Sequence, residues 1–242
     1  FETSFKAFKV WEGGAISPLR HIVEPYANYT LIPEPELTAD NIYQFDSIDD
    51  LGERHDVRFG VRNKWQTKHN ERPWDLVDVN VFTRYLFIDE VRGIDNLFFD
   101  AEFRPYLWLK VDVDGRWNTD ESELDTFNTR LWTTQRRHWR GQMEYRYRRD
   151  ASSLLLGETV LSPNMHWDFG THGRYEFEEQ RLQEVGGYVQ KNLDCLSLRL
   201  GTNVLPSYTR AIGMEEETEW NVLFQVWLTA FPEHRIRTHL HH

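Results

Sequence analysis

Charged side chains recur at alternate positions in several stretches of this sequence, which would place them together on one face of extended strands. The nine that we take as candidate binding residues are Arg58, Arg62, Lys64, Glu102, Arg104, Lys110, Arg146, Arg174 and Glu176. Arginine suits the geometry of phosphate groups, so these residues could contact the headgroup of a phosphorylated lipid. The plainer interpretation, which we favour, is a water-facing surface of cross-strand ion pairs.

Catalytic and metal sites are less well supported. His166, Asp168 and His172 share one face of a strand, and two histidines with a carboxylate can bind a metal ion. However, His166 and His172 would lie about 20 Å apart at about 3.3 Å per residue. Asp112 and Asp114 read more simply as solvated charges than as an acid–base pair. With no nucleophile motif, Gly-rich phosphate loop or CxxC pair, we expect no enzyme, no cofactor and no metal site.

The element that organises the charged positions is the stretch from 99 to 114. Its odd positions are all apolar, and six of its eight even positions carry a formal charge. This period of two predicts one long strand with an apolar face and a wet face. Globular strands average about 5–6 residues, whereas membrane-spanning strands need about 9–11. The stretch therefore indicates the wall of a large barrel.

Similar alternation recurs along the chain and predicts an all-β fold. We expect an antiparallel transmembrane β-barrel, or the C-terminal part of one, with about twelve long strands over residues 1–231. A tail at 232–242 would follow, either derived from a purification tag or native. Besides 99–114, the predicted strands cover 3–11, 19–32, 57–68, 75–87, 126–133, 138–148, 152–161, 165–177, 182–191, 195–205 and 220–230. Aromatic residues gather at the strand ends, where the girdles of a membrane barrel would lie. They are Trp65, Tyr85, Phe87, Phe99, Tyr145, Tyr147, Tyr175, Phe177 and Trp220.

Composition agrees with this class. The net charge of -11 argues against a nucleic-acid surface, and aromatic residues make up 14% of the 242-residue chain. No apolar run is long enough for a transmembrane helix, which does not conflict with membrane-spanning strands. A single cysteine, Cys195, rules out an internal disulfide. The chain begins at Phe1 without a signal peptide, so we expect a mature chain or a fragment.

Several weak motifs occur in an order that resembles the LptD family of outer-membrane lipopolysaccharide-assembly proteins. An R-H-x-x-E-P motif falls on Arg20, His21, Glu24 and Pro25, and an R-x-G-x-x-N motif falls on Arg58, Gly60 and Asn63. Segments at 145–150, 162–184 and 193–200 also look like late barrel strands of that family. The likeness spans roughly residues 18–230, although the chain is much shorter than the family's whole barrel.

The resemblance implies a location in the bacterial outer membrane and a role in lipopolysaccharide assembly. In that family the barrel encloses a plug lipoprotein, LptE, and passes lipopolysaccharide outward between its first and last strands. We therefore expect lipopolysaccharide, an LptE-like plug, the barrel-assembly machinery and outer-membrane lipid as partners, and no nucleic acid. The strand at 220–230 would be one lip of the gate, with Asn221 and Gln225 as gate residues. Cys195 would be a candidate for a disulfide with an N-terminal domain.

Three other functions fit the same alternation. A porin-like diffusion channel would use the same strands, a soluble glycan-binding β-sandwich would bury the apolar faces against each other, and a hydrolase could sit within a barrel. A sandwich should have strands nearer to about 5–6 residues.

Overall fold

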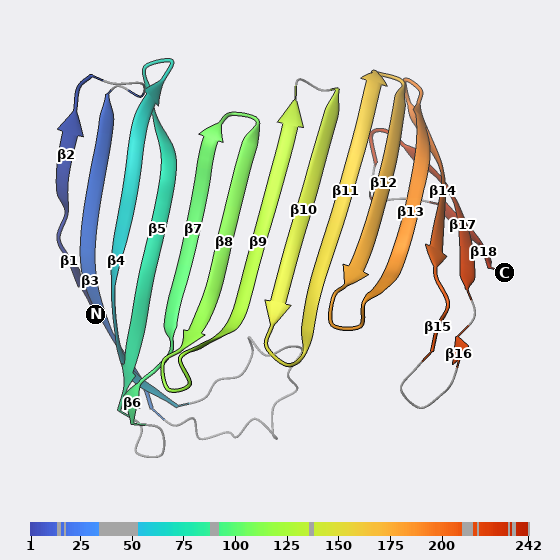
Figure 1. The fold of residues 1–242 in the computed structure, drawn as a ribbon. Helices are drawn as coiled ribbons and strands as arrows, with labels where there is room; N and C mark the ends of the chain where they lie inside the picture. The colour runs from blue at the N-terminus through green and yellow to red at the C-terminus, as the bar shows by residue number, and fades with distance from the viewer. Residues whose placement is uncertain are drawn as a thin grey trace. The chain divides into compact units, whose positions relative to one another are not determined.

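The fold is built from β-strands that pair antiparallel (Figure 1). A computed structural model describes residues 1–13, 16, 18–33, 53–87, 92–135, 138–209, 215–216, 218–231, 233 and 236–241. In that part of the chain, twelve strands have ten residues or more. The prediction of an all-β antiparallel fold with about twelve long strands is therefore confirmed. No described helix is long and apolar enough to cross a membrane.

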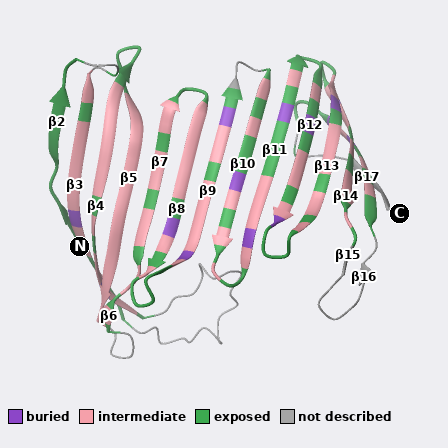
Figure 2. Cartoon of the chain, viewed as in Figure 1, coloured by how far each residue is buried: buried purple, intermediate pink, exposed green. Residues whose placement is uncertain are grey.

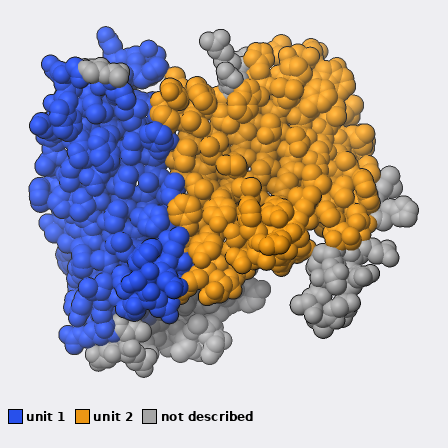
Figure 3. All heavy atoms as spheres, viewed as in Figure 1, with its two compact units in different colours: residues 1–104, 113–125 blue, residues 105–112, 126–242 orange. Residues whose placement is uncertain are grey.

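The chain forms two compact units, coloured separately in Figure 3. Unit 1 comprises residues 1–104 and 113–125. Strands β3, β4, β5 and β7 pair in that order, β1 and β2 both pair with β3, and β6 pairs with β5. The strands of this unit are β1 (Glu2–Ser4), β2 (Ala7–Trp11), β3 (Leu19–Ile32), β4 (Arg54–His69), β5 (Arg72–Leu86), β6 (Gly93–Ile94) and parts of β7 (Leu97–Tyr106), β8 (Leu109–Asn118) and β9 (Glu123–Gln135).

Unit 2 comprises residues 105–112 and 126–242. Strands β9 to β14 pair in sequence order, β14 continues to β17, β17 pairs with β18, and β15 pairs separately with β16. Besides parts of β7, β8 and β9, its strands are β10 (Trp139–Arg148), β11 (Ser152–Asn164), β12 (Trp167–Glu176), β13 (Arg181–Asn192), β14 (Leu196–Leu205), β15 (Tyr208–Thr209), β16 (Glu215–Glu216), β17 (Glu219–Leu228) and β18 (Ile236–His241).

The stretch from 99 to 114 is not the single strand that its alternation predicted. A turn at Leu107 and Trp108 divides it between β7 and β8. The Trp108 carbonyl accepts a hydrogen bond of 2.9 Å from the Thr134 amide of β9. Neither turn residue is one of the Gly, Pro, Asn, Asp or Ser residues that usually mark a turn. Leu107 keeps the apolar phase and the charged phase resumes at Lys110, so the alternation continued across the turn and did not reveal it.

One further prediction about strand positions is wrong. The strand predicted at 220–230 is not terminal, because β17 pairs on one side with β14 and on the other with β18, which lies within the predicted tail.

Pro25 affects only one side of β3. The ladder between β3 and β4 keeps one register across it. The ladder between β3 and the N-terminal segment is interrupted at Phe5 and Lys6, beside this proline that has no N–H to donate.

The register sorts alternate residues onto opposite faces within each unit, because directly opposed residues point the same way. In unit 1, Val61 lies opposite Pro25 and Val81, whereas the next residue, Arg62, lies opposite Glu24 and Asn80. In unit 2, Met143 lies opposite Leu131 and Gly157, whereas Glu144 lies opposite Arg130 and Leu156. Each unit therefore has one face that we call the apolar face and one that we call the charged face.

Buried residues, purple in Figure 2, are scattered along the strands, and their types follow an inverted pattern. Among the described residues, the buried apolar side chains are Tyr26, Val160 and Trp227, while nine buried side chains are polar or charged. Side chains of the apolar faces are exposed instead, including Phe59, Met143 and Leu200 at 41%, 46% and 57%. A water-soluble protein places its large apolar residues inside. This chain exposes them on one face of each unit and buries carboxylates and amides on the other.

Candidate functional site

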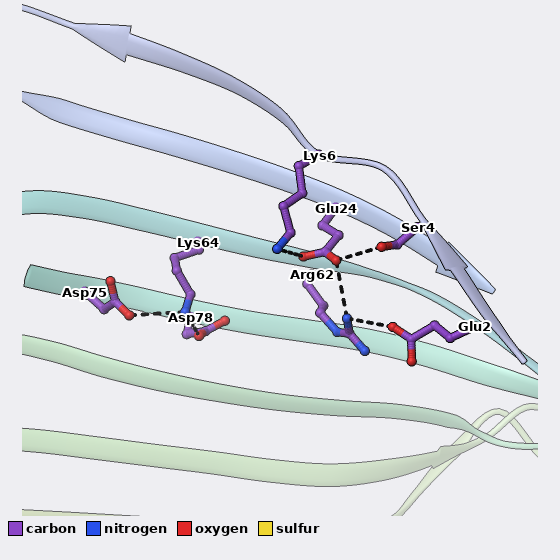
Figure 4. A network of polar contacts seen from close by, with 8 residues as sticks. All are labelled: Glu2, Ser4, Lys6, Glu24, Arg62, Lys64, Asp75 and Asp78. Atoms are coloured by element: carbon purple, nitrogen blue, oxygen red, sulfur yellow. Dashed lines mark hydrogen bonds and ion pairs between the residues drawn. The ribbon is translucent and has the colours of Figure 1, made fainter. Parts of the chain in front are cut away.

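The charged face of unit 1 carries a chain of ion pairs that joins the N-terminal segment to β3 and β4 (Figure 4). Glu24 of β3 accepts a hydrogen bond of 3.0 Å from the Ser4 hydroxyl and lies 3.5 Å from both Lys6 and Arg62. Arg62 also contacts Glu2 at 3.3 Å. These contacts bridge the seam between the N-terminal segment and β3 at the point where Pro25 interrupts its ladder.

Lys64, Glu102 and Arg104 also lie on this face with carboxylate or cation partners. Lys64 is 2.8 Å from Asp78 and 3.1 Å from Asp75. Arg104 is 2.7 Å from Glu102, which lies directly opposite Asp78 in the register of β5 and β7. The Lys64 pairs cross from β4 to β5, as the interpretation that we favoured from the sequence requires, whereas the pair of Arg104 and Glu102 lies within β7.

Arg58, in contrast, lies directly opposite another arginine, Arg84. Its guanidinium carbon lies 3.5 Å from the centroid of the Phe82 ring. A planar guanidinium over an aromatic ring is a stable arrangement that leaves the in-plane N–H donors free for other partners.

The charged face of unit 2 holds the remaining candidates. Lys110 lies 2.9 Å from Asp112, and Arg146 lies 2.7 Å from Glu144, which also accepts a bond of 2.9 Å from Arg130. Glu144 is only 6% exposed, so its charge is held by two guanidinium groups in a largely dry position.

Arg174 contributes to a hollow of about 410 Å³ on this face. Tyr188 lies across Gly170, where an added Cβ would approach the ring to 2.1 Å. Arg199 in turn stacks over the Tyr188 ring at 4.0 Å. The hollow is lined by Gln142, Glu144, Leu156, Gly157, Glu158, His172, Gly173, Arg174, Glu184, Gly187, Tyr188, Arg199, Gly201, Asn203 and Leu223.

Glu176 does not have the open position expected of a headgroup contact. It is 5% exposed, and its Oε1 accepts hydrogen bonds from the Ser153 amide at 2.6 Å and the Glu178 amide at 3.4 Å. The carboxylate therefore fixes the turn after β12. An acidic residue that caps a turn cannot be told from a solvated one by alternation alone.

The predicted gate residues and the cysteine occupy ordinary structural positions. Asn221 lies opposite Asn203 and His241, and Gln225 lies opposite Arg199 and Arg237, so both belong to a strand that is paired on each side. Cys195 is exposed, in the turn between β13 and β14. Its expected disulfide stays a prediction.

The three residues considered for a metal ion point to different partners. His166 Nδ1 lies 3.3 Å from the Asn192 carbonyl, Asp168 accepts a bond of 2.5 Å from the Ser162 hydroxyl, and His172 Nε2 lies 3.4 Å from Glu184. Within the described ranges, no cluster of three or more His, Cys, Asp or Glu side chains could hold a metal ion.

Aromatic clusters lie at both ends of the apolar face of unit 1. At one end His21 is stacked between Trp11 and Trp65, at centroid distances of 6.3 Å and 4.3 Å. At the other end His55 contacts the rings of Tyr29 and Phe87. Trp65 and His55 are ten residues apart on β4, which is about 33 Å at about 3.3 Å per residue.

In unit 2, aromatic clusters at the two ends of β12 have the same ten-residue separation. Trp167 stacks with Phe169 near the start of the strand, and Phe177, just past its end, contacts Tyr145 and Tyr175. Trp167 and Phe177 are also ten residues apart. With the tilt of about 35–45° usual in membrane barrels, this separation projects to about 25 Å, the height of their apolar band.

Several residues that shape the charged faces did not stand out in the sequence. Glu24 and Glu144 supply carboxylates for Arg62 and Arg146, and Glu184 lies directly opposite Arg174 in the register. Tyr26 and Tyr188 each cover a glycine of a neighbouring strand. Such pairs depend on the register between strands, which a single alternation pattern does not contain.

The structure thus defines an all-β antiparallel protein whose sheets have one charged and one exposed apolar face. No model of a known protein family matches the sequence, and no curated protein matches it either.

Proposed function

We propose that this chain forms part of a β-barrel wall in the outer membrane of a bacterium, with its apolar faces against lipid and its charged faces against water. The observation that carries the proposal is the inverted burial, with exposed apolar faces and buried carboxylates and amides. Lipid is the one solvent in which exposing such faces on long strands costs little. The aromatic clusters ten residues apart in both units support the same assignment.

Within that class we propose a role in lipopolysaccharide assembly, in which a phosphorylated headgroup moves along the charged face while its acyl chains stay in lipid. The resemblance to the LptD family supports this role, and its two clearest motifs meet in the structure. His21 Nε2 lies 3.3 Å from Asn63 Oδ1, and Glu24 lies 3.5 Å from Arg62, so the motifs form neighbouring parts of one strand pair.

A porin-like channel is the alternative that the same faces favour, since ion-paired interiors also suit the passage of small polar solutes. A soluble β-sandwich fits less well, because its apolar faces should be buried against one another. Here Phe59, Met143 and Leu200 are exposed.

Fractionation of cells that express the native protein tests the location. We expect it to sediment with outer membranes, to resist a wash with high salt or alkali, and to be released by detergent. Recovery as a monodisperse soluble protein without detergent would overturn the proposal.

Depletion of the protein in its native bacterium separates lipopolysaccharide assembly from simple diffusion. Loss of lipopolysaccharide from the cell surface, measured by its access to an added modifying enzyme, is the result that we expect. Normal surface lipopolysaccharide with reduced uptake of small solutes would favour the channel.

A further inference from the structure

We propose that Arg58 and Arg84, on the charged face of unit 1, form a binding subsite for a phosphate group. The proposal deepens the function proposed above and rests on it for identifying the source of that phosphate as a glycolipid headgroup. Three features of the arginine pair support this subsite: like charges in direct opposition, a rigid aromatic support, and a guanidinium without a carboxylate partner among the described residues.

The first feature is the opposition of like charges. Arg58 of β4 and Arg84 of β5 face each other in the register, an arrangement that destabilises a sheet unless something offsets it. Neighbouring cations of this face, such as Arg62 and Lys64, have carboxylates within 3.5 Å. Among the described residues, no carboxylate lies within ion-pair distance of Arg58.

The second feature is a stacked support that holds both guanidinium groups in place. Arg58 lies over the Phe82 ring at 3.5 Å, and Arg84 lies over the Phe98 ring at 5.0 Å. The two rings stack on each other, with centroids 5.1 Å apart and planes 10° apart. Because the fork of each arginine is already oriented, binding an oxyanion costs less side-chain entropy.

The third feature is the charge that remains once each nearby carboxylate is assigned. Asp95 lies 2.6 Å from Arg84, and Asp56, two positions from Arg58 on β4, lies 2.5 Å from Arg54. Glu2, in the same cross-strand row as Arg58, contacts Arg62 at 3.3 Å. In the part of the chain that the structure describes, Arg58 is therefore left without a carboxylate of its own, beside Arg84, which is paired with Asp95.

These features select an oxyanion that two guanidinium groups can share. Paired N–H donors of arginine match the oxygen spacing of phosphate, and such charge-assisted bonds are roughly twice as strong as neutral ones. Within the described ranges, the Nε atoms of both arginines are buried without a hydrogen-bond partner, and the one carboxylate paired with either guanidinium is Asp95, on Arg84. A phosphate placed between them would offset the repulsion that the register imposes.

The test is the thermal unfolding midpoint of the intact protein in detergent, titrated at constant ionic strength with inorganic phosphate and, separately, with lipid A, a bis-phosphorylated acylated disaccharide. An anion that binds only the folded state raises this midpoint. We expect Arg58→Gln to weaken the response by about tenfold or more in concentration. Arg58→Lys, which keeps the charge but loses the fork, should be intermediate. The matched control is Arg130→Gln, whose arginine already donates to Glu144 at 2.9 Å, and it should respond as the wild type does.

Unliganded Arg58→Gln should keep the wild-type midpoint or exceed it, because one of two opposed charges is removed. A response to lipid A alone that requires Arg58 identifies a lipid headgroup as the source, whereas an equal response to inorganic phosphate identifies the free ion, and both support the subsite. Equal responses of wild type and Arg58→Gln to both probes overturn it. An Arg58-dependent response in a protein that fractionates as soluble would keep the subsite and reject the membrane function.

Discussion

At the scale of single residues, the space around two glycines differs, with Gly60 in unit 1 closely packed and Gly157 in unit 2 open. An added Cβ at Gly60 would lie 2.5 Å from the Val81 carbonyl oxygen and 2.9 Å from the Tyr26 hydroxyl. The Tyr26 ring is 5% exposed, and its hydroxyl donates to Asn80 at 3.0 Å. Gly157, in contrast, has no heavy atom within 4 Å of such a Cβ.

Gly60→Ala should therefore lower the free energy of unfolding by about 1–3 kcal/mol, the usual cost of overpacking. Gly157→Ala should leave it unchanged or raise it by up to about 1 kcal/mol, because alanine loses less backbone entropy on folding. Urea unfolding of both variants in the same detergent measures the difference. Equal losses at the two positions would show that the contact of Tyr26 with Gly60 does not constrain the sheet.

The residue scale is also where the sequence was least informative. Alternation placed Arg58, Arg62 and Lys64 on one face, but it could not show that Arg62 would find Glu24 while Arg58 would find Arg84. Those outcomes depend on the register between strands far apart in sequence. The same limit explains why Glu176 was taken for an open charge and proves to be a buried turn cap.

At the scale of elements, the prediction of strand limits was most accurate at β3. The strand predicted at 19–32 has the same limits as β3. The prediction of strand limits failed at Leu107 and Trp108, where a turn interrupts a stretch that alternates on both sides of it. It also failed at β18, which lies in the segment taken for a tail. Alternation reports which face a residue occupies, but it does not report where the chain reverses.

The two faces of β10 give a test with adjacent residues. Met143 lies on the apolar face and is 46% exposed, whereas Gln142 lies on the charged face, directly opposite Glu158. In a bilayer, Met143→Arg should cost about 2–4 kcal/mol of stability, as arginine does on the lipid side near the midplane. Gln142→Arg should cost far less, because its charge meets both water and Glu158.

Unfolding of both variants in lipid vesicles provides the measurement. A soluble protein would tolerate Met143→Arg, since substitutions at exposed positions usually change stability by about 0.5 kcal/mol or less. A harmless Met143→Arg in vesicles would thus contradict the assignment of this face to lipid.

At the scale of the whole molecule, the organisation follows from which solvent meets each face. A chain with 40% apolar residues and a net charge of -11 would ordinarily build a core and a charged surface. In both units the apolar residues are instead spread over one face of a single layer of strands, and the carboxylates are held by cations on the other. Composition alone could not predict this inversion, whereas alternation over strands of ten residues or more did.

The most direct test of the lipid-facing assignment is the accessibility of spin labels placed one at a time from residue 77 to residue 84 of β5, after replacing Cys195 with serine. In vesicles, labels at Val77, Val79, Val81 and Thr83 should collide mainly with oxygen, which concentrates in lipid. Labels at Asp78, Asn80, Phe82 and Arg84 should collide mainly with a water-soluble nickel complex. The account predicts that the two accessibilities alternate with a period of two and opposite phase. High access of the nickel complex at all eight positions would contradict it.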